Sequence, residues 1–165
     1  MKSHILRSTR SSPRRGLLAF PVVAALSATQ ALAAGGLVSA TASGNDGNVP
    51  ANAIDGSLAT RWSNLGSGSW LTGDMGQVKS LKAVDIAWYR GDTRASRFTL
   101  LVSMDGTTFT QVFSGTSSGL TASYERYTFS AVNARYVKVT VNGNTQNAWA
   151  SISEMTVTAD TTSTW

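Results

Sequence analysis

Residues 83–88 read Ala83-Val84-Asp85-Ile86-Ala87-Trp88, and this stretch decides the fold class. The apolar side chains of Val84, Ile86 and Trp88 recur at every second position, which in an extended strand places them on one face. An amphipathic helix would instead need apolar residues three or four positions apart. The stretch therefore predicts a β-strand with one buried face.

The same period of two recurs along the chain, between clusters of Gly, Asn, Ser and Asp. Phe98, Leu100 and Val102 alternate in this way, and Asp105-Gly106 lies between two such runs as a hairpin-turn signal. No stretch keeps a helical period beyond one turn. We expect strands at residues 37–42, 69–75, 81–88, 96–103, 109–114, 124–129, 135–141 and 152–158. Eight short strands separated by turn residues predict an all-β sandwich or jelly roll.

The first 33 residues have the composition of an export signal. Five basic residues and no acidic ones precede an apolar stretch at 17–26, and Ala31-Leu32-Ala33 follows as a small-x-small cleavage site. The apolar stretch is too short to span a bilayer, which needs roughly 20 residues. We expect residues 1–33 to be a cleavable signal peptide and the protein to be secreted. An amphipathic first helix is the alternative, although Gly16, Pro21 and Gly35-Gly36 would interrupt it. Export would follow the Sec route or, because of the Arg14-Arg15 pair, the twin-arginine route.

All of the excess positive charge lies in this leader. The chain has 14 Lys and Arg against nine Asp and Glu, and five of the 14 precede Ala33. The nine basic residues that remain balance the nine acidic ones, so residues 34–165 are formally neutral. A nucleic-acid-binding domain is expected to keep a basic face. We therefore expect no nucleic-acid partner.

The residue types that remain after the leader also exclude several kinds of catalysis. The chain has no Cys, and its one His is His4, inside the leader. Ser-His-Asp and Cys-His catalysis and His-based zinc sites are therefore excluded from the mature protein. About 130 residues suit a single domain, which we place at 34–159. Residues 160–165 are small and polar up to Trp165 and predict a linker or a frayed tail.

Residues 52–63 read NAIDGSLATRWS, with an A-x-D-G-x-x-x-T-x-W pattern that begins at Ala53. This pattern resembles a segment of the discoidin-like (coagulation factor 5/8 type C) domains. Further matches occur at Trp70-Leu71 before Asp74-Met75-Gly76, at 98–109, at Arg135-Tyr136-Val137 and at Ile152-Ser153-Glu154-Met155. The resemblance spans roughly residues 37–159.

Within that superfamily, residues 88–94 and 143–149 resemble the loops of family 32 carbohydrate-binding modules, of the kind attached to bacterial alginate lyases. The resemblance implies an eight-stranded, galactose-binding-domain-like jelly roll that is itself non-catalytic. It also implies a sugar site on loops at one end, a polysaccharide ligand and a covalently linked catalytic domain. We expect a monomer without a membrane partner.

A structural Ca²⁺ is a further implication of the resemblance. Calcium prefers six to eight oxygen ligands at about 2.3–2.6 Å. Asp55 and Glu154 offer carboxylates and Thr60 offers a hydroxyl, and the resemblance adds the backbone carbonyls of Asn52, Ser57, Thr60 and Ser153. From spacing alone, a plain Asp-Gly turn with Glu154 on a solvated strand edge explains the same residues.

The expected sugar site combines cations, aromatic rings and amides. The resemblance gathers Arg61, Tyr89, Arg90, Arg94, Asn144, Trp149, Asp46 and Asn64 at one end. An Arg fork pairs with a carboxylate through two parallel hydrogen bonds, so three Arg on one rim suit a uronate polymer such as alginate or pectin. Neutral galactosides and cationic, chitosan-like sugars remain alternatives. Trp62, Trp70 and Trp88 are expected in the core, whereas Trp149 suits the core or a ligand platform equally.

Two other functions fit parts of the sequence. Tyr89, Arg90 and Arg94 could mimic the base and the charge neutraliser of a uronate lyase, and the chain could be a fragment of such an enzyme. A single small domain without His argues against catalysis by the module itself. An adhesion or phospholipid-binding discoidin domain would present apolar spikes on the same loops, for which only Leu65 and Trp149 are candidates.

Overall fold

The computed structural model describes residues 36–159, which confirm the all-β class. The expected signal peptide and the tail at 160–165 lie outside the described residues. The described elements are β1 Ser39–Ala42, the 3-10 helix η1 Pro50–Ala53, β2 Trp62–Leu65, β3 Ser69–Trp88, β4 Ser96–Ser103, β5 Thr110–Thr116, β6 Tyr124–Asn144 and β7 Trp149–Ala159.

Two of these strands are long, and each includes two segments that we expected as separate strands. β3 runs through 69–75 and 81–88, and β6 runs through 124–129 and 135–141. Their pairing shifts register between Asp74 and Lys79 and again between Leu81 and Ala83. Irregularities of this kind bend a strand, so that it can pass from one sheet to another. The described residues therefore form seven strands instead of eight, including β2, which shows no alternation and was not expected.

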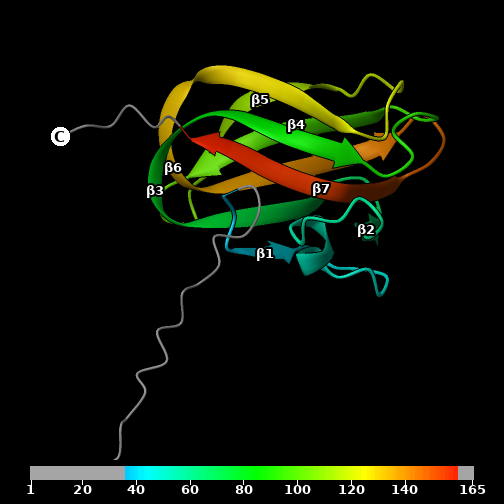
Figure 1. The fold of residues 1–165 in the computed structure, drawn as a ribbon, viewed down its shortest axis with the longest axis horizontal. Coiled ribbons are helices and arrows are strands. Elements are labelled where there is room, and N and C mark those ends of the chain that lie inside the picture. The colour runs from blue at the N-terminus through cyan, green and yellow to red at the C-terminus, as the bar shows by residue number, and fades with distance from the viewer. Residues whose placement is uncertain (1–35, 160–165) are drawn as a thin grey trace, which may run out of the picture.

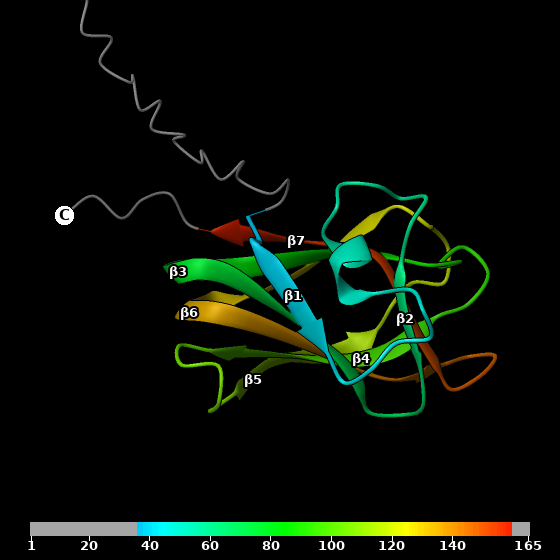
Figure 2. The ribbon, with the colours of Figure 1, turned by 90° about the horizontal axis from the view of Figure 1, so that it is seen from below.

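The bends arrange the strands in two facing layers, and β3 and β6 take part in both (Figures 1 and 2). One layer has the order β1, first half of β3, second half of β6, β4 and β5. The other has the order β2, β7, second half of β3 and first half of β6. All of these pairings are antiparallel, as expected of a jelly-roll sandwich.

Aromatic side chains join the two layers. Phe98 of β4 packs against Trp88 of β3 and Tyr127 of β6, with ring centroids 4.9 and 4.6 Å apart respectively. The Trp88 indole N–H donates a hydrogen bond to the Tyr127 hydroxyl over 3.0 Å. Val84 and Ile86 are fully buried beside them, as the alternation at 83–88 predicted.

Trp70 was expected in the core, and this expectation is wrong. Its neighbour Leu71 takes the buried position, so Trp70 lies partly exposed on the outer face of the first layer. The Lys138 ammonium lies 4.9 Å from the Trp70 ring and 3.7 Å from the Phe109 ring. Trp62 and Trp88 are fully buried, as expected.

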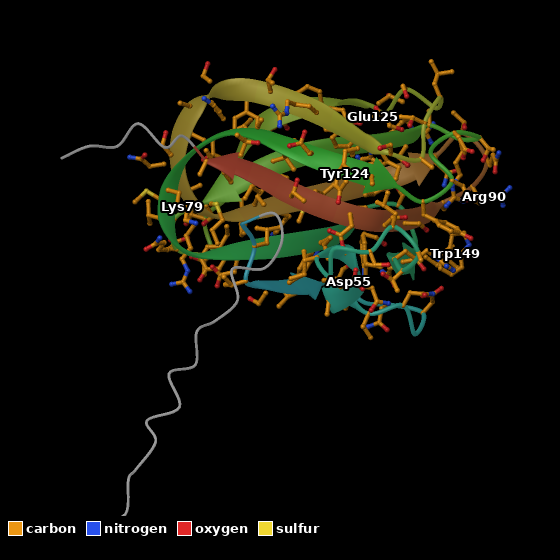
Figure 3. The ribbon with its side chains drawn as sticks, in the orientation of Figure 1. Asp55, Lys79, Arg90, Tyr124, Glu125 and Trp149 are labelled. Atoms are coloured by element: carbon orange, nitrogen blue, oxygen red, sulfur yellow. The ribbon has the colours of Figure 1, made fainter. Side chains whose placement is uncertain are left out.

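The two ends of the sandwich carry different residues. Arg90 and Trp149 lie at one end, and Lys79 lies at the other (Figure 3). β7 leaves the Trp149 end and finishes at Ala159, which pairs with Leu81 close to the Lys79 bend. Nowhere in residues 36–159 is there a helix with the length and apolar character needed to cross a membrane.

Candidate functional site

An open hollow of about 250 Å³ lies at the Trp149 end of the sandwich. Its walls come from the loop after β1, the end of the loop before β2, β2 itself, the loop after β3, the turn between β6 and β7, and the start of β7. The lining residues are Asp46, Arg61, Ser63, Tyr89, Arg94, Asn147, Trp149 and Ser151. Ser63 lies opposite Ser151 in the β2–β7 ladder, and two such small side chains leave room in the floor of the hollow.

Two guanidinium groups flank the ring of Tyr89. The Cζ atom of Arg61 lies 4.2 Å from the ring centroid, and that of Arg94 lies 5.6 Å from it. Cation–π contacts contribute roughly 0.5–1 kcal/mol each at exposed sites and more when desolvated. The hollow therefore has one wall with two positive charges held in place by an aromatic ring.

Arg94 is the more deeply buried of these two cations, with only 8% of its surface exposed. Burial, together with the neighbouring charges of Arg90 and Arg61, lowers the pKa of its guanidinium. The group stays protonated at neutral pH because the ordinary pKa of Arg is so high. None of the carboxylates that the structure describes forms an ion pair with Arg94; the described pairs are Arg126–Asp85 and Arg135–Asp74. A buried charge without a counter-charge is costly, so an anionic ligand would be stabilised here.

Asn144 shapes the hollow without lining it. Its buried amide nitrogen donates to the Asn147 side-chain oxygen over 2.7 Å and to the Trp149 carbonyl over 3.0 Å. Its amide oxygen accepts the backbone N–H groups of Gln146 and Asn147. The Gln146 side chain then donates to the carbonyl of Thr93, which holds this turn against the loop of Arg94.

Of the eight side chains expected at the sugar site, five line the hollow: Asp46, Arg61, Tyr89, Arg94 and Trp149. Arg90 lies exposed at the same end, in a left-handed backbone conformation with φ of 54°. Asn144 lies behind the hollow, and Asn64 donates instead to the hydroxyls of Ser43 and Ser69. The structure therefore does not place Arg90, Asn144 or Asn64 in the wall of the hollow.

Three further lining residues were not singled out from the sequence: Ser63, Asn147 and Ser151. Asn147 belongs to the 143–149 segment that resembles a loop of the carbohydrate-binding modules, so this resemblance could have predicted its place in the hollow. The two serines become neighbours only through the β2–β7 pairing, and the sequence gives no sign of β2.

The residues expected to hold a metal form a separate cluster of oxygen atoms, between the 52–60 segment and β7. The Thr60 hydroxyl lies 2.7 Å from Asp55 Oδ2, 3.2 Å from the Ser57 carbonyl and 3.5 Å from the Asn52 carbonyl. The backbone N–H of Gly56 donates to Glu154 Oε1 over 2.8 Å. Figure 3 shows Asp55 near η1, on the side of the molecule facing away from β5.

Glu154 carries the strongest evidence that this cluster fits a cation. It is fully buried, and its Oε2 atom has no hydrogen-bond partner among the described residues. Burial and the nearby Asp55 carboxyl raise the pKa of Glu154 to about 7. Burial opposes the downward shift at Asp55, but hydrogen bonds from Thr60 and Ser57 lower its pKa nonetheless. A buried acidic oxygen without a donor, beside a second carboxylate, is suited to a hard divalent cation.

Backbone carbonyls would have to complete the shell, because no third acidic side chain joins the pair within residues 36–159. Ser153 is well placed for this. β3 pairs with Glu154 and then with Ile152, so Ser153 is the extra residue of a bulge. The backbone of a bulged residue is left out of the ladder, which frees its carbonyl group. The residues present therefore fit the expected metal.

Comparison with known proteins gives the family of the chain. The sequence profile of the F5/8 type C domain matches residues 38–155. The chain belongs to this family. No curated protein sequence matches it.

Solved structures show which members of the F5/8 type C family this domain is similar to. It has 48% identity and a TM-score of 0.73 with the CBM32 of AlyQ in complex with 4,5-unsaturated mannuronic acid, over 74% of this chain and 95% of that chain. A truncated AlyQ with CBM32 and alginate lyase domains has 47% identity and a TM-score of 0.74, over 76% of this chain and 33% of that chain. A pectin-binding carbohydrate-binding module has 30% identity and a TM-score of 0.72, over 78% of this chain and 94% of that chain. The high identity over almost the whole AlyQ module places this F5/8 type C domain among the CBM32 carbohydrate-binding modules.

Proposed function

We propose that the hollow at the Trp149 end binds an acidic polysaccharide of the uronate class, such as alginate. Arg94 carries this proposal, because it is a nearly buried cation that opens on the hollow without a carboxylate partner among the described residues. A uronate sugar supplies one carboxylate, which an Arg fork can bind through two parallel hydrogen bonds. Trp149 offers an aromatic face to the sugar ring, and Asn147 and Asp46 offer partners for its hydroxyls.

The relatives support this ligand class. One AlyQ complex contains 4,5-unsaturated mannuronic acid, and a second relative is described as pectin-binding. Both names refer to acidic sugars. The two guanidinium groups beside Tyr89 supply the complementary charge in this chain.

The module is itself non-catalytic and keeps a linked polysaccharide-degrading enzyme on its substrate. The AlyQ chain, in which CBM32 is combined with an alginate lyase domain, supports this arrangement. Residues 1–33 direct secretion and are then removed, which brings the module to extracellular polysaccharide. Residues 160–165 form either a linker to that enzyme or a tail of the module.

The oxygen cluster holds a structural Ca²⁺. The side chains of Asp55, Thr60 and Glu154 bind it together with the carbonyls of Asn52, Ser57, Thr60 and Ser153. The ion offsets the two carboxylate charges and ties the 52–60 segment to β7. Because it binds the folded chain alone, it stabilises the fold by mass action.

Isothermal titration calorimetry tests the glycan ligand. The purified chain, in excess Ca²⁺, is titrated with oligosaccharides from alginate, pectin, galactan and chitosan. We expect binding of a uronate oligosaccharide and none of galactan or chitosan. Arg94→Gln should weaken the binding about tenfold or more, because hydrogen bonds to charged groups contribute roughly 1.5–3 kcal/mol.

The matched control is Lys79→Gln, which removes one positive charge at the opposite end of the sandwich. This variant should bind like the wild type. An equal loss in both variants would reduce the effect to net charge, and tight binding of galactan or chitosan would contradict the proposed ligand class.

A further inference from the structure

The hollow and the oxygen cluster share two segments of the chain. In the first segment, Thr60 belongs to the cluster and the next residue, Arg61, lines the hollow. In β7, Ser151 lines the hollow and Glu154 belongs to the cluster. The two segments lie side by side, because β2 pairs with β7 and Trp62 lies opposite Ile152. In these two segments, the residues of one site therefore lie one to three positions from the residues of the other.

Asn52 contacts both sites. Its backbone carbonyl oxygen lies 3.5 Å from the Thr60 hydroxyl in the oxygen cluster. Its side-chain amide donates a hydrogen bond of 3.0 Å to the backbone carbonyl of Arg61. One residue thus connects the position of an oxygen in the cluster with the backbone that carries a cation of the hollow.

Arg61 has little else to hold it. The hydrogen bond from Asn52 is the only one that Arg61 makes within residues 36–159. Its Nε atom is buried there without a partner, and its guanidinium is placed by stacking on Tyr89. Stacking restrains the distance to the ring but leaves the guanidinium free to rotate about the stacking axis. The backbone anchor at Asn52 therefore matters for where Arg61 presents its charge.

We propose that a divalent cation in the oxygen cluster raises the affinity of the hollow for its glycan, and that Asn52 is the positioning residue that links the two. The inference rests on the glycan and metal functions proposed above. With the cation bound, the Asn52 carbonyl and the Thr60 hydroxyl are drawn to one point, and the segment that holds Arg61 is ordered. Without the cation, this constraint on the segment is lost, and glycan binding has to order the segment itself.

Coupling between two binding sites is reciprocal, so the glycan must raise the affinity for the cation by the same factor. Calorimetry measures both directions on the full chain: Ca²⁺ with and without a saturating alginate trisaccharide, and the trisaccharide with Ca²⁺ or with EDTA. We expect each dissociation constant to fall by about fivefold or more when the other ligand is present. Asn52→Ala keeps the backbone carbonyl of the cluster and removes only the amide that donates to Arg61, so the factor should approach one.

The matched control is Asn133→Ala. Asn133 is exposed and pairs with Ser80 beside the Lys79 bend, at the opposite end of the sandwich. It should keep the full coupling factor. A factor that falls equally in both variants would mean that Asn52 has no special part in the coupling.

Hydrogen–deuterium exchange gives a readout that needs no glycan. Calcium alone should slow amide exchange at 61–63 as well as at 55–60, and in Asn52→Ala the protection should stop at residue 60. If Ca²⁺ binds but the protection ends at residue 60 in the wild type and the glycan affinity is unchanged, the coupling is wrong. If the trisaccharide never binds, the proposed ligand is wrong and the exchange data still decide the role of Asn52. A chain that binds no Ca²⁺ overturns the proposal.

Discussion

At the scale of single residues, Glu154 is an acidic side chain without solvent exposure in a strand of small and apolar neighbours. Its burial, with Asp55 nearby, raises its pKa to about 7 in the metal-free chain. A carboxyl whose folded-state pKa is raised stabilises the fold when protonated, below its unfolded pKa near 4.3. That stability is lost as the pH rises through about 7, unless a cation compensates the charge.

Glu154→Gln tests this arrangement, because glutamine has the same shape and no charge. In EDTA at pH 8 we expect the variant to melt at the same temperature as the wild type or higher. In excess Ca²⁺ we expect it to melt lower, since only the wild type gains the ion. Thermal unfolding followed by circular dichroism measures both. An equal response of the two proteins to Ca²⁺ would show that Glu154 does not bind the ion.

The residues of the hollow differ in how far the sequence predicts them. Arg61, Tyr89 and Arg94 could be placed together because they belong to family motifs or to the loop after a strongly alternating strand. Asn144 was expected among the sugar-binding side chains, but it ends β6, and the four hydrogen bonds of its side chain depend on positions that no sequence pattern reports. Whether a loop amide points at a ligand or into its own turn is decided by local packing.

At the scale of elements, alternation predicts some strands to the residue and others poorly. The strand at 96–103 was predicted with the bounds that β4 has, because its apolar residues face one core. β3 and β6 change layers midway, so their middle residues, such as 76–80, have the polar composition of loops although the strands continue through them. Trp70 was misplaced for a different reason, because an aromatic residue in a strand can also face outward.

The outer ion pair between β3 and β6 gives a prediction for these elements. Arg135 Nε lies 2.9 Å from Asp74 Oδ1, and its second nitrogen lies 3.0 Å from Oδ2. The hydrogen bonds from Arg135 lower the pKa of Asp74, against the effect of partial burial. The pair therefore stabilises the fold above the unfolded pKa of Asp, about 3.9, and this stability is lost as the pH falls through the folded pKa.

Asp74→Asn should consequently melt at a lower temperature than the wild type at pH 7. The difference should shrink as the pH is lowered and vanish once Asp74 is protonated in both states. Melting curves across an acid pH series measure it. A difference that stays constant with pH would attribute the effect of the substitution to packing instead of charge.

At the scale of the whole molecule, the hollow and the exit of the described chain lie at opposite ends. Trp149 begins β7 at the hollow, and Ala159 ends it beside the Lys79 bend (Figure 3). The described chain therefore ends at the end of the sandwich opposite the hollow, so a domain joined there would leave the proposed glycan site open. Fusing a folded reporter protein to the C-terminus should leave the glycan dissociation constant unchanged.

A variant at the end that carries the hollow should behave differently from the C-terminal fusion. A bulky maleimide attached to Arg90→Cys, at the exposed edge of the binding end, should weaken glycan binding strongly. Calorimetry of the fused and the labelled proteins compares the two cases. Weakening by the C-terminal fusion, or tolerance of the label, would mean that the glycan approaches from another side.

β7 also fixes how the domain transmits force. In the proposed arrangement, a linked enzyme would pull on Ala159 while the hollow beside Trp149 held the glycan, so the tension would run along the whole of β7. Its hydrogen bonds to β3 are perpendicular to that direction. They are loaded in shear and have to break together, whereas a strand pulled sideways would peel off one bond at a time. We expect the domain to behave under load as a stiff tether between substrate and enzyme.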